Sequence, residues 1–205
     1  MIRLRKSLFT ALALICFALP AYAAPEIGQT APEFTGTDSN GVTHNLSDFR
    51  GKKVVLEWTN HGCPFVQKHY GSGNMQELQK QATDNGVVWL TVASSAPGEQ
   101  GNTTPEEANK LMEEQGAHPT ARIMDPSGEI GQLYQAKTTP HMYVIDEQGI
   151  LQYMGAIDSN SSPNPDTIEG ATNYVTAALE SLNKGETVAE ASTRPYGCAV
   201  KYKMF

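Results

Sequence analysis

The chain has only three cysteines in 205 residues, at Cys16, Cys63 and Cys198. Three are too few for the disulfide framework that stabilises small secreted domains, so cross-linking does not explain them. Cys16 lies inside the apolar segment at the start of the chain. Cys63 and Cys198 are therefore the cysteines whose chemical role has to be identified.

Positive charge is also scarce, with 15 basic residues against 22 acidic ones and a formal net charge of −7. An acidic chain attracts neither nucleic acid nor an anionic membrane surface, so neither is expected as a partner. The sequence lacks a glycine-rich nucleotide-binding motif as well, and we expect no dinucleotide and no other cofactor.

Long apolar runs are absent except for one at the start of the chain, spanning residues 8–20. Three basic residues precede this run, and the small-residue pattern of residues 21–23 follows it, which is the layout of a secretory signal peptide. The run is shorter than the roughly 20 residues that cross a bilayer. We expect cleavage after Ala23, a periplasmic protein and no membrane insertion after cleavage; an uncleaved membrane anchor is the alternative. Losing three basic residues would leave 12 against 22 acidic ones, a net charge of −10.

The remaining residues have the length of one domain, which we place at 24–185, followed by a tail at 186–205 that carries Cys198. Apolar runs and helical periodicities alternate along the domain. The expected elements are a hairpin within 25–52, strands at 54–58, 87–92 and 121–124, helices at 64–83 (broken near 71–74), 104–116, 128–134 and 166–182, and a second hairpin from strands 141–145 and 150–154. Strands separated by helices pair in parallel and hairpin strands pair antiparallel, so the predicted fold class is α/β, with a central mixed β-sheet flanked by helices.

Cys63 stands between a predicted buried strand and a helix whose first position is Pro64. At a helix N-terminus, free backbone N–H groups and the helix dipole favour a negative charge. They would stabilise the thiolate, which is the nucleophilic form of cysteine. The alternative is an inert cysteine that packs as a small apolar side chain. The position at a strand-to-helix turn favours the reactive interpretation.

Two segments resemble the active-site motifs of the thioredoxin superfamily. Residues 56–64, Leu-Glu-Trp-Thr-Asn-His-Gly-Cys-Pro, are similar to its active-site strand and turn, and residues 138–141, Thr-Thr-Pro-His, are similar to its cis-proline loop. The resemblance implies a thioredoxin-like fold. It also implies that Thr139 offers backbone hydrogen bonds to a bound chain and that Pro140 packs against the sulfur of Cys63.

Glu57 lies six residues before Cys63, where thioredoxins carry a buried acid that exchanges protons with the active-site thiols. The resemblance therefore implies the same role for Glu57. A carboxyl group inside an apolar strand has a raised pKa because burial disfavours its charged form, which suits proton transfer. A glutamate exposed at the edge of the strand is the alternative.

The sequence departs from two well-known thiol classes. Val66 stands three residues after Cys63, so the Cys-x-x-Cys pattern of thioredoxin-type reductases is absent, and Leu56 and Asn60 replace the proline and the threonine or serine of typical peroxiredoxins. The chain is instead similar to redoxins related to the alkyl hydroperoxide reductase and thiol-specific antioxidant family, including extracytoplasmic members with a single-cysteine turn. This resemblance implies a thiol oxidoreductase that acts on a protein thiol or disulfide or on a small peroxide. The missing peroxide-site residues favour disulfide exchange.

Cys198 lies near the end of the chain, where Pro195 and Gly197 predict a turn that could bring the tail back over the domain. A Cys198 that reaches Cys63 could resolve a mixed disulfide or a sulfenic acid there. A static disulfide or an unpaired thiol is the alternative, and the sequence does not choose between them.

A non-catalytic protein is the competing functional class. Its cis-proline groove would hold an extended peptide or a metal while Cys63 and Cys198 stay locked in a disulfide. His61, His69 and His141 could lie near Cys63, but the Cys-x-x-x-Cys pattern of thioredoxin-fold copper chaperones is absent. We therefore predict no metal site and expect these histidines to stabilise the thiolate or to be solvated.

Overall fold

The computed structural model describes residues 24–203, so the predicted signal segment, its cleavage site, Cys16 and the last two residues of the tail lie outside the described part. The strands are β1 (Thr35–Asp38), β2 (Thr43–Asn45), β3 (Val54–Trp58), β4 (Val88–Ala93), β5 (Ala121–Met124), β6 (Thr138–Thr139), β7 (His141–Ile145), β8 (Leu151–Gly155) and β9 (Cys198–Ala199). The helices are α1 (Pro64–Gly71), α2 (Asn74–Asp84), α3 (Pro105–Gln115), α4 (Glu129–Leu133) and α5 (Tyr174–Asn183), with 3-10 turns at Leu46–Phe49 and Pro165–Thr167.

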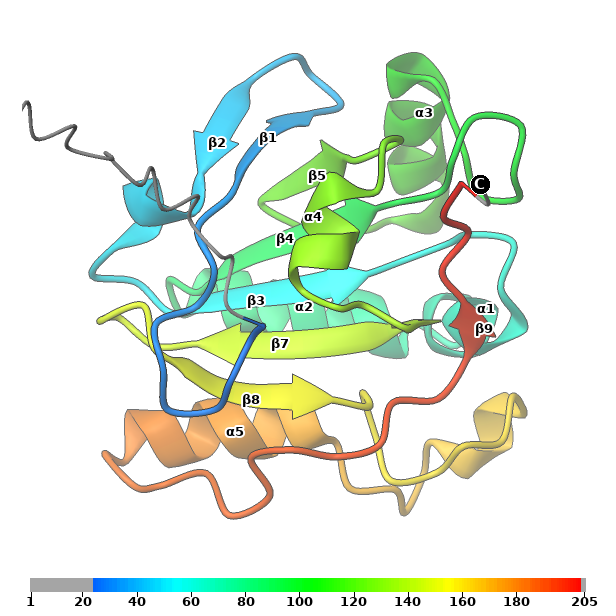
Figure 1. Cartoon of the computed structure of the whole chain (residues 1–205). Coiled ribbons are helices and arrows are strands. Elements are labelled where there is room, and N and C mark those ends of the chain that lie inside the picture. The colour runs from blue at the N-terminus through cyan, green and yellow to red at the C-terminus, as the bar shows by residue number, and fades with distance from the viewer. Residues whose placement is uncertain (1–23, 204–205) are drawn as a thin grey trace, which may run out of the picture.

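Seven of the strands form one mixed sheet in the order β2-β1-β5-β4-β3-β7-β8 (Figure 1). The central strands β3, β4 and β5 run parallel, whereas β7 and β8 are antiparallel to their neighbours and β1 and β2 form the N-terminal hairpin. The predicted α/β class with a central mixed sheet is therefore confirmed. Among residues 24–203, β6 and β9 make a separate two-stranded sheet, through which the tail joins the domain.

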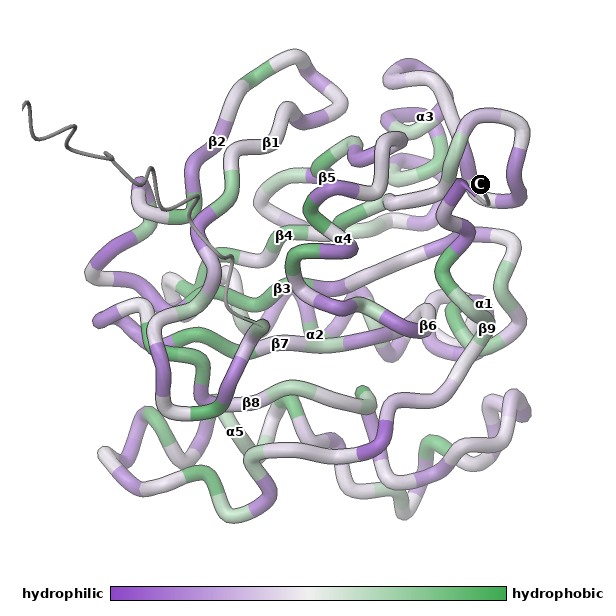
Figure 2. Tube along the Cα trace, viewed as in Figure 1, coloured by the Kyte–Doolittle hydropathy of each residue, from purple (hydrophilic) through white to green (hydrophobic). Residues whose placement is uncertain are grey.

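Alternate residues of β3 supply two different cores, because successive side chains of a strand point to opposite faces. Leu56 and Trp58 pack on the face that α4 covers, and Val55 packs on the face that α1, α2 and α5 cover. Figure 2 shows apolar residues in the central strands β3 and β4, whereas β1 and β2 at the edge of the sheet are polar. Burial on both faces fixes β3, and with it the turn that carries Cys63.

The two predicted helix boundaries with the clearest signals are confirmed. The helical segment after Cys63 breaks at Gly73, whose φ of +80° is in the region that glycine tolerates best. The next helix, α3, begins with a capping box in which the Thr104 hydroxyl accepts a hydrogen bond from the backbone N–H of Glu107. It ends at Gly116 with a φ of +60°.

The predicted helix at 166–182 is wrong in its first half. A 3-10 turn at Pro165–Thr167 comes first, and Gly170 then takes a φ of +83° that interrupts the helical backbone. The helix α5 starts only after Asn173, whose side chain accepts a hydrogen bond from the backbone N–H of Thr176. Helical periodicity predicts too long a helix here, because it takes no account of the helix-capping residue Asn173 or of the helix-breaking Gly170. No helix within residues 24–203 is long and apolar enough to cross a bilayer.

Candidate active site

The turn before α1 is held by Asn60 rather than by an apolar contact. Its side-chain oxygen accepts a hydrogen bond from the Gly62 N–H at 2.9 Å, and its side-chain nitrogen donates to the Gln100 carbonyl at 3.0 Å. The backbone N–H of Cys63 donates to the Asn60 carbonyl at 3.0 Å. Cys63 is thereby placed as the N-cap residue of α1, with Pro64 at the first helical position, as the sequence predicts.

The cis-proline loop lies directly against the sulfur of Cys63. The Thr139–Pro140 peptide bond is cis. The Cys63 thiol donates a hydrogen bond to the carbonyl oxygen of Thr139, with 3.1 Å between Sγ and O. Two segments separated by 76 residues therefore meet at the sulfur of Cys63.

The tail brings Cys198 to the same place. Strand β9 pairs antiparallel with β6, and Cys198 is the register partner of Thr139. Both cysteines are free thiols, but they differ in exposure: Cys63 is 0 % exposed, whereas Cys198 is half-buried. Figure 1 shows the tail in red passing beside α1 at the end of the sheet. Cys63 is therefore covered by the segment that carries the second thiol.

The pKa values of the two thiols are shifted in opposite directions. Burial by itself raises the pKa of Cys63, but hydrogen bonds from the side chain and the backbone N–H of Cys198 outweigh it, so the pKa lies below its usual value. Burial and the neighbouring Cys63 sulfur raise the pKa of Cys198 to about 11. Cys63 is therefore the thiol that ionises first, and Cys198 stabilises its thiolate.

Glu57 is fully buried, which excludes the alternative of an exposed strand-edge residue. Burial raises its pKa, against three hydrogen bonds that favour the carboxylate. The donors are the Tyr70 hydroxyl at 2.9 Å, the Trp89 indole at 2.9 Å and the Gln79 amide at 3.1 Å. Among the described residues, no hydrogen bond joins Glu57 to Cys63, so proton exchange between the two groups stays a prediction.

Arg122, on β5, adds a positive charge to the Glu57 cluster. In the sheet, Glu57 on β3 and Arg122 on β5 both align with Thr91 on β4. Arg122 is 3 % exposed, and its Nε and Nη2 atoms make no hydrogen bond within the described residues. Its charge favours the ionised form of Glu57. Among the described residues no ion pair joins the two side chains, so Arg122 acts on Glu57 across β4 through its charge and not through a contact.

Glu57→Gln should lower the free energy of unfolding by about 2 kcal/mol, because it turns an amide NH2 group toward buried donors that need an acceptor. The measurement is urea unfolding at neutral pH. Glu186→Gln is the matched control, since Glu186 is exposed and its substitution should change stability by less than about 0.5 kcal/mol. A loss of less than about 1 kcal/mol for Glu57→Gln would contradict this account of the cluster.

Among the described residues, no hydrogen bond joins His61, His69 or His141 to Cys63. His69 is fully buried and contacts Asn74 through Nδ1 and Tyr196 through Nε2, and His141 packs against Tyr143 with its ring tilted by 43° and 4.6 Å between ring centroids. Burial lowers the pKa of His69 to about 4 and that of His141 to about 3, so both are neutral at neutral pH. Within residues 24–203, no group of three or more His, Cys, Asp or Glu side chains could hold a metal ion.

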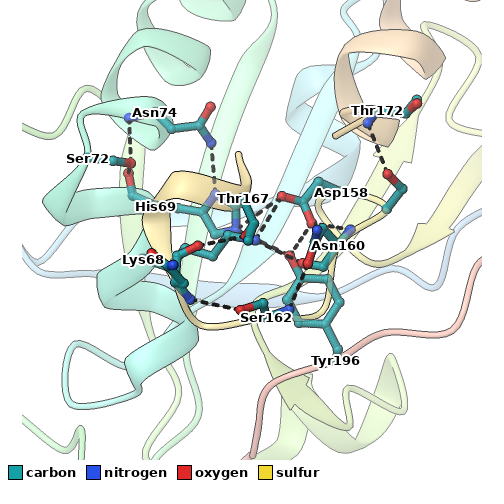
Figure 3. Close-up of polar contacts among 12 residues, drawn as sticks. Lys68, His69, Ser72, Asn74, Asp158, Asn160, Ser162, Thr167, Thr172 and Tyr196 are labelled. Atoms are coloured by element: carbon teal, nitrogen blue, oxygen red, sulfur yellow. Dashed lines mark hydrogen bonds and ion pairs between the residues drawn. The ribbon is translucent and has the colours of Figure 1, made fainter. Parts of the chain in front are cut away.

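A buried polar cluster that includes a residue of the tail was missed by the sequence analysis. It joins Lys68 and His69 of α1 to Asp158, which follows β8, and to Tyr196 of the tail (Figure 3). Lys68 lies 3.2 Å from the Asp158 carboxylate and both side chains are buried. Buried charged groups need partners. The presence of a lysine and a histidine on the buried side of α1 was therefore the sequence signal that could have indicated this cluster.

Fold and site together define a thioredoxin-like protein with two adjacent thiols. The model of the AhpC/TSA family matches residues 27–154, more than half of the chain, and the chain belongs to this family. The matched region includes Cys63 and Pro140 but ends before Cys198. A thiol-disulfide oxidoreductase ResA of Geobacillus kaustophilus is 30% identical over 128 residues, which cover 57% of this chain and 73% of that protein.

Solved structures support the same fold. An uncharacterized conserved protein of Geobacillus kaustophilus aligns with a TM-score of 0.73 and 26% identity, covering 88% of this chain and 94% of the other. A hypothetical protein of Sinorhizobium meliloti aligns with a TM-score of 0.76 and 20% identity, covering 89% and 98%. The thioredoxin domain of a thiol-disulfide oxidoreductase of Bacteroides vulgatus aligns less closely, with a TM-score of 0.51, 21% identity and coverage of 71% and 97%.

Proposed function

We propose that this protein is a thiol-disulfide oxidoreductase whose Cys63 and Cys198 interconvert between two thiols and one intramolecular disulfide. The observation that carries the proposal is the pairing of Cys198 with Thr139, the residue whose carbonyl also accepts the hydrogen bond from Cys63. The lowered pKa of Cys63 supports its role as the nucleophile. The relatives named as thiol-disulfide oxidoreductases support the same reaction class.

In the proposed reaction the Cys63 thiolate attacks one sulfur of a protein disulfide. A bond forms between Cys63 and that sulfur, and the other client sulfur leaves as a thiolate. The Cys198 thiol then loses its proton to solvent. The resulting thiolate attacks the sulfur of Cys63 and releases the first client sulfur as a second thiolate. The client gains two electrons and, after protonation, two thiols, while the enzyme is left with a Cys63–Cys198 disulfide. Run in reverse, the same steps oxidise a client dithiol.

Peroxide is the less suitable substrate for this site. The side chain of Leu56 belongs to the apolar core, and both ends of the Asn60 amide are already hydrogen-bonded within the turn. Neither residue offers a hydroxyl to a peroxide oxygen. Rapid formation of a sulfenic acid on Cys63 with one equivalent of peroxide would reverse this preference.

We place the reaction in the periplasm, with proteins as partners. The support is the predicted signal segment of residues 1–23, and a compartment in which protein disulfides persist provides the partners that the reaction needs.

A redox titration in glutathione buffers tests the proposed function. Wild-type protein should lose both thiols in one transition and become two hydrogens lighter, because the second thiol lies beside the first. Cys63→Ser and Cys198→Ser should each form only a mixed disulfide with glutathione. Independent glutathionylation of both cysteines in the wild type would contradict the proposal. So would a Cys63–Cys198 bridge that resists dithiothreitol under native conditions, which is the behaviour of a static disulfide in a binding module.

A further inference from the structure

The tail of residues 194–203 lies along the domain as an added strand. Besides the β6–β9 pairing, the Val200 N–H donates to the Lys137 carbonyl at 3.1 Å, and the Ala96 N–H donates to the Lys201 carbonyl at 2.8 Å. Main-chain hydrogen bonds of this kind hold extended peptides on sheet edges in many complexes. The tail therefore binds its own domain in the way that an extended ligand would.

A tyrosine anchors the tail two residues before Cys198. The Tyr196 hydroxyl donates to Asp158 and contacts Nε2 of His69 at 3.3 Å (Figure 3). Its ring lies 5.8 Å from the ring of Phe65 and 5.6 Å from the Lys68 ammonium group, measured to the ring centroid. An aromatic ring and an ammonium group therefore pack against the tyrosine ring, and buried polar side chains form hydrogen bonds with its hydroxyl. These contacts together suit the side chain of a tyrosine.

Glycine is required between that tyrosine and the cysteine. A Cβ atom on Gly197 would lie 2.1 Å from the carbonyl oxygen of Thr139, and the residue has a φ of +134°. Both facts exclude a residue with a side chain, since the backbones of the tail and of the cis-proline loop meet here. The position immediately before Cys198 therefore accepts only glycine, just as the position before it is suited to tyrosine.

A second tyrosine anchors the tail four residues after Cys198. The Tyr202 hydroxyl donates to the Ala136 carbonyl at 2.8 Å. Its side chain packs on Gly128 and Gly131, where added Cβ atoms would approach to 2.7 Å and 2.5 Å. The two tyrosine anchors hold the intervening cysteine over Cys63.

We propose that the surface beneath the tail is a peptide-binding groove with a sequence preference, and that the chain's own tail is its resident occupant. The groove consists of the cis-proline loop of residues 138–140, the Lys68–His69–Asp158 cluster and the turn of residues 128–131. Its external ligands are extended polypeptide segments with a cysteine, a glycine immediately before it and a tyrosine two residues before it. In such a complex the client sulfur takes the place of Cys198, next to the Cys63 sulfur. This inference rests on the proposed function, because it names the class of client that reaches Cys63.

Competition between tail and client follows from their shared site. A segment tethered in the same chain acts at an effective concentration of about the millimolar range. A free segment with the same contacts therefore binds poorly while the tail is docked. Release of the tail exposes at once the groove and the buried Cys63 thiol.

A fluorescent peptide with the sequence of residues 194–203, carrying serine in place of cysteine, tests the groove without any redox reaction. We expect it to bind a Tyr196→Ala/Tyr202→Ala protein at least about tenfold more tightly than wild type, because the variant's tail has lost both anchors while the groove is intact. Fluorescence anisotropy gives both affinities. A Gly197→Ala protein provides a second, independent way to displace the tail and should also bind the peptide more tightly.

The control peptide carries alanine in place of the glycine before the serine. It should bind the double variant at least about tenfold more weakly than the parent peptide, because the clash with the Thr139 carbonyl remains. Equal affinities for the two peptides, or equal binding to wild type and to both tail variants, would overturn the inference. The glutathione titration is independent of peptide binding, so it separates failure of this inference from failure of the proposed function.

Discussion

Gly197→Ala should speed the alkylation of Cys63 by about 100-fold at neutral pH. In the wild type Cys63 is 0 % exposed, so iodoacetamide reaches it only when the tail is released. A methyl group on Gly197 would overlap the Thr139 carbonyl oxygen at 2.1 Å, and a loss of about 3 kcal/mol in tail docking raises the open population about 100-fold. Mass spectrometry of the Cys63 peptide after timed quenching measures the rate.

Gly71→Ala is the control for that experiment. Gly71 lies at the end of α1, and an added Cβ there meets no atom within 4 Å. Its alkylation rate should stay within about twofold of wild type, since surface substitutions of this kind have small effects. An unchanged rate in Gly197→Ala would show that the tail does not limit access to Cys63.

Cys63→Ser should reduce disulfide exchange by at least about 1,000-fold, measured as the dithiothreitol-driven reduction of insulin. Serine preserves the shape of the side chain but its hydroxyl is not a nucleophile at neutral pH without an activating base. Cys198→Ser should instead accumulate a mixed disulfide between Cys63 and the client, visible on non-reducing gels, because the step that releases the client is lost. Substantial turnover by the Cys63→Ser protein would exclude Cys63 as the nucleophile.

Much of the fold was predictable because its signals are local. Each of three correct predictions depends on a few neighbouring residues: the buried strand of residues 54–58, the helix break near Gly73 and the Thr104 cap. The start of α5 was missed although its signal is also local, since the Asn173 cap was not weighed against periodicity. Local patterns therefore gave the order of the elements more reliably than their ends.

The site was predictable only in part, because it is assembled from distant segments. Cys63 and Pro140 were recognised by their motifs, and the burial of Glu57 could not be decided from the strand alone. The register that sets Cys198 opposite Thr139 joins positions 59 residues apart and leaves no periodic trace in a two-residue strand. Asp158 lies in a loop, where nothing in the sequence indicates that it meets a lysine, a histidine and a tyrosine.

The covering of Cys63 by its own partner thiol has a consequence for oxidative damage. Irreversible loss of a cysteine requires successive additions of oxygen to the same sulfur, beyond the sulfenic acid stage. An oxidised Cys63 beneath the docked tail meets Cys198 before it meets another oxidant molecule, and condensation with that thiol returns it to a reducible bond. The strand that covers Cys63 also keeps a second thiol beside it, and we expect this arrangement to protect Cys63 from irreversible oxidation.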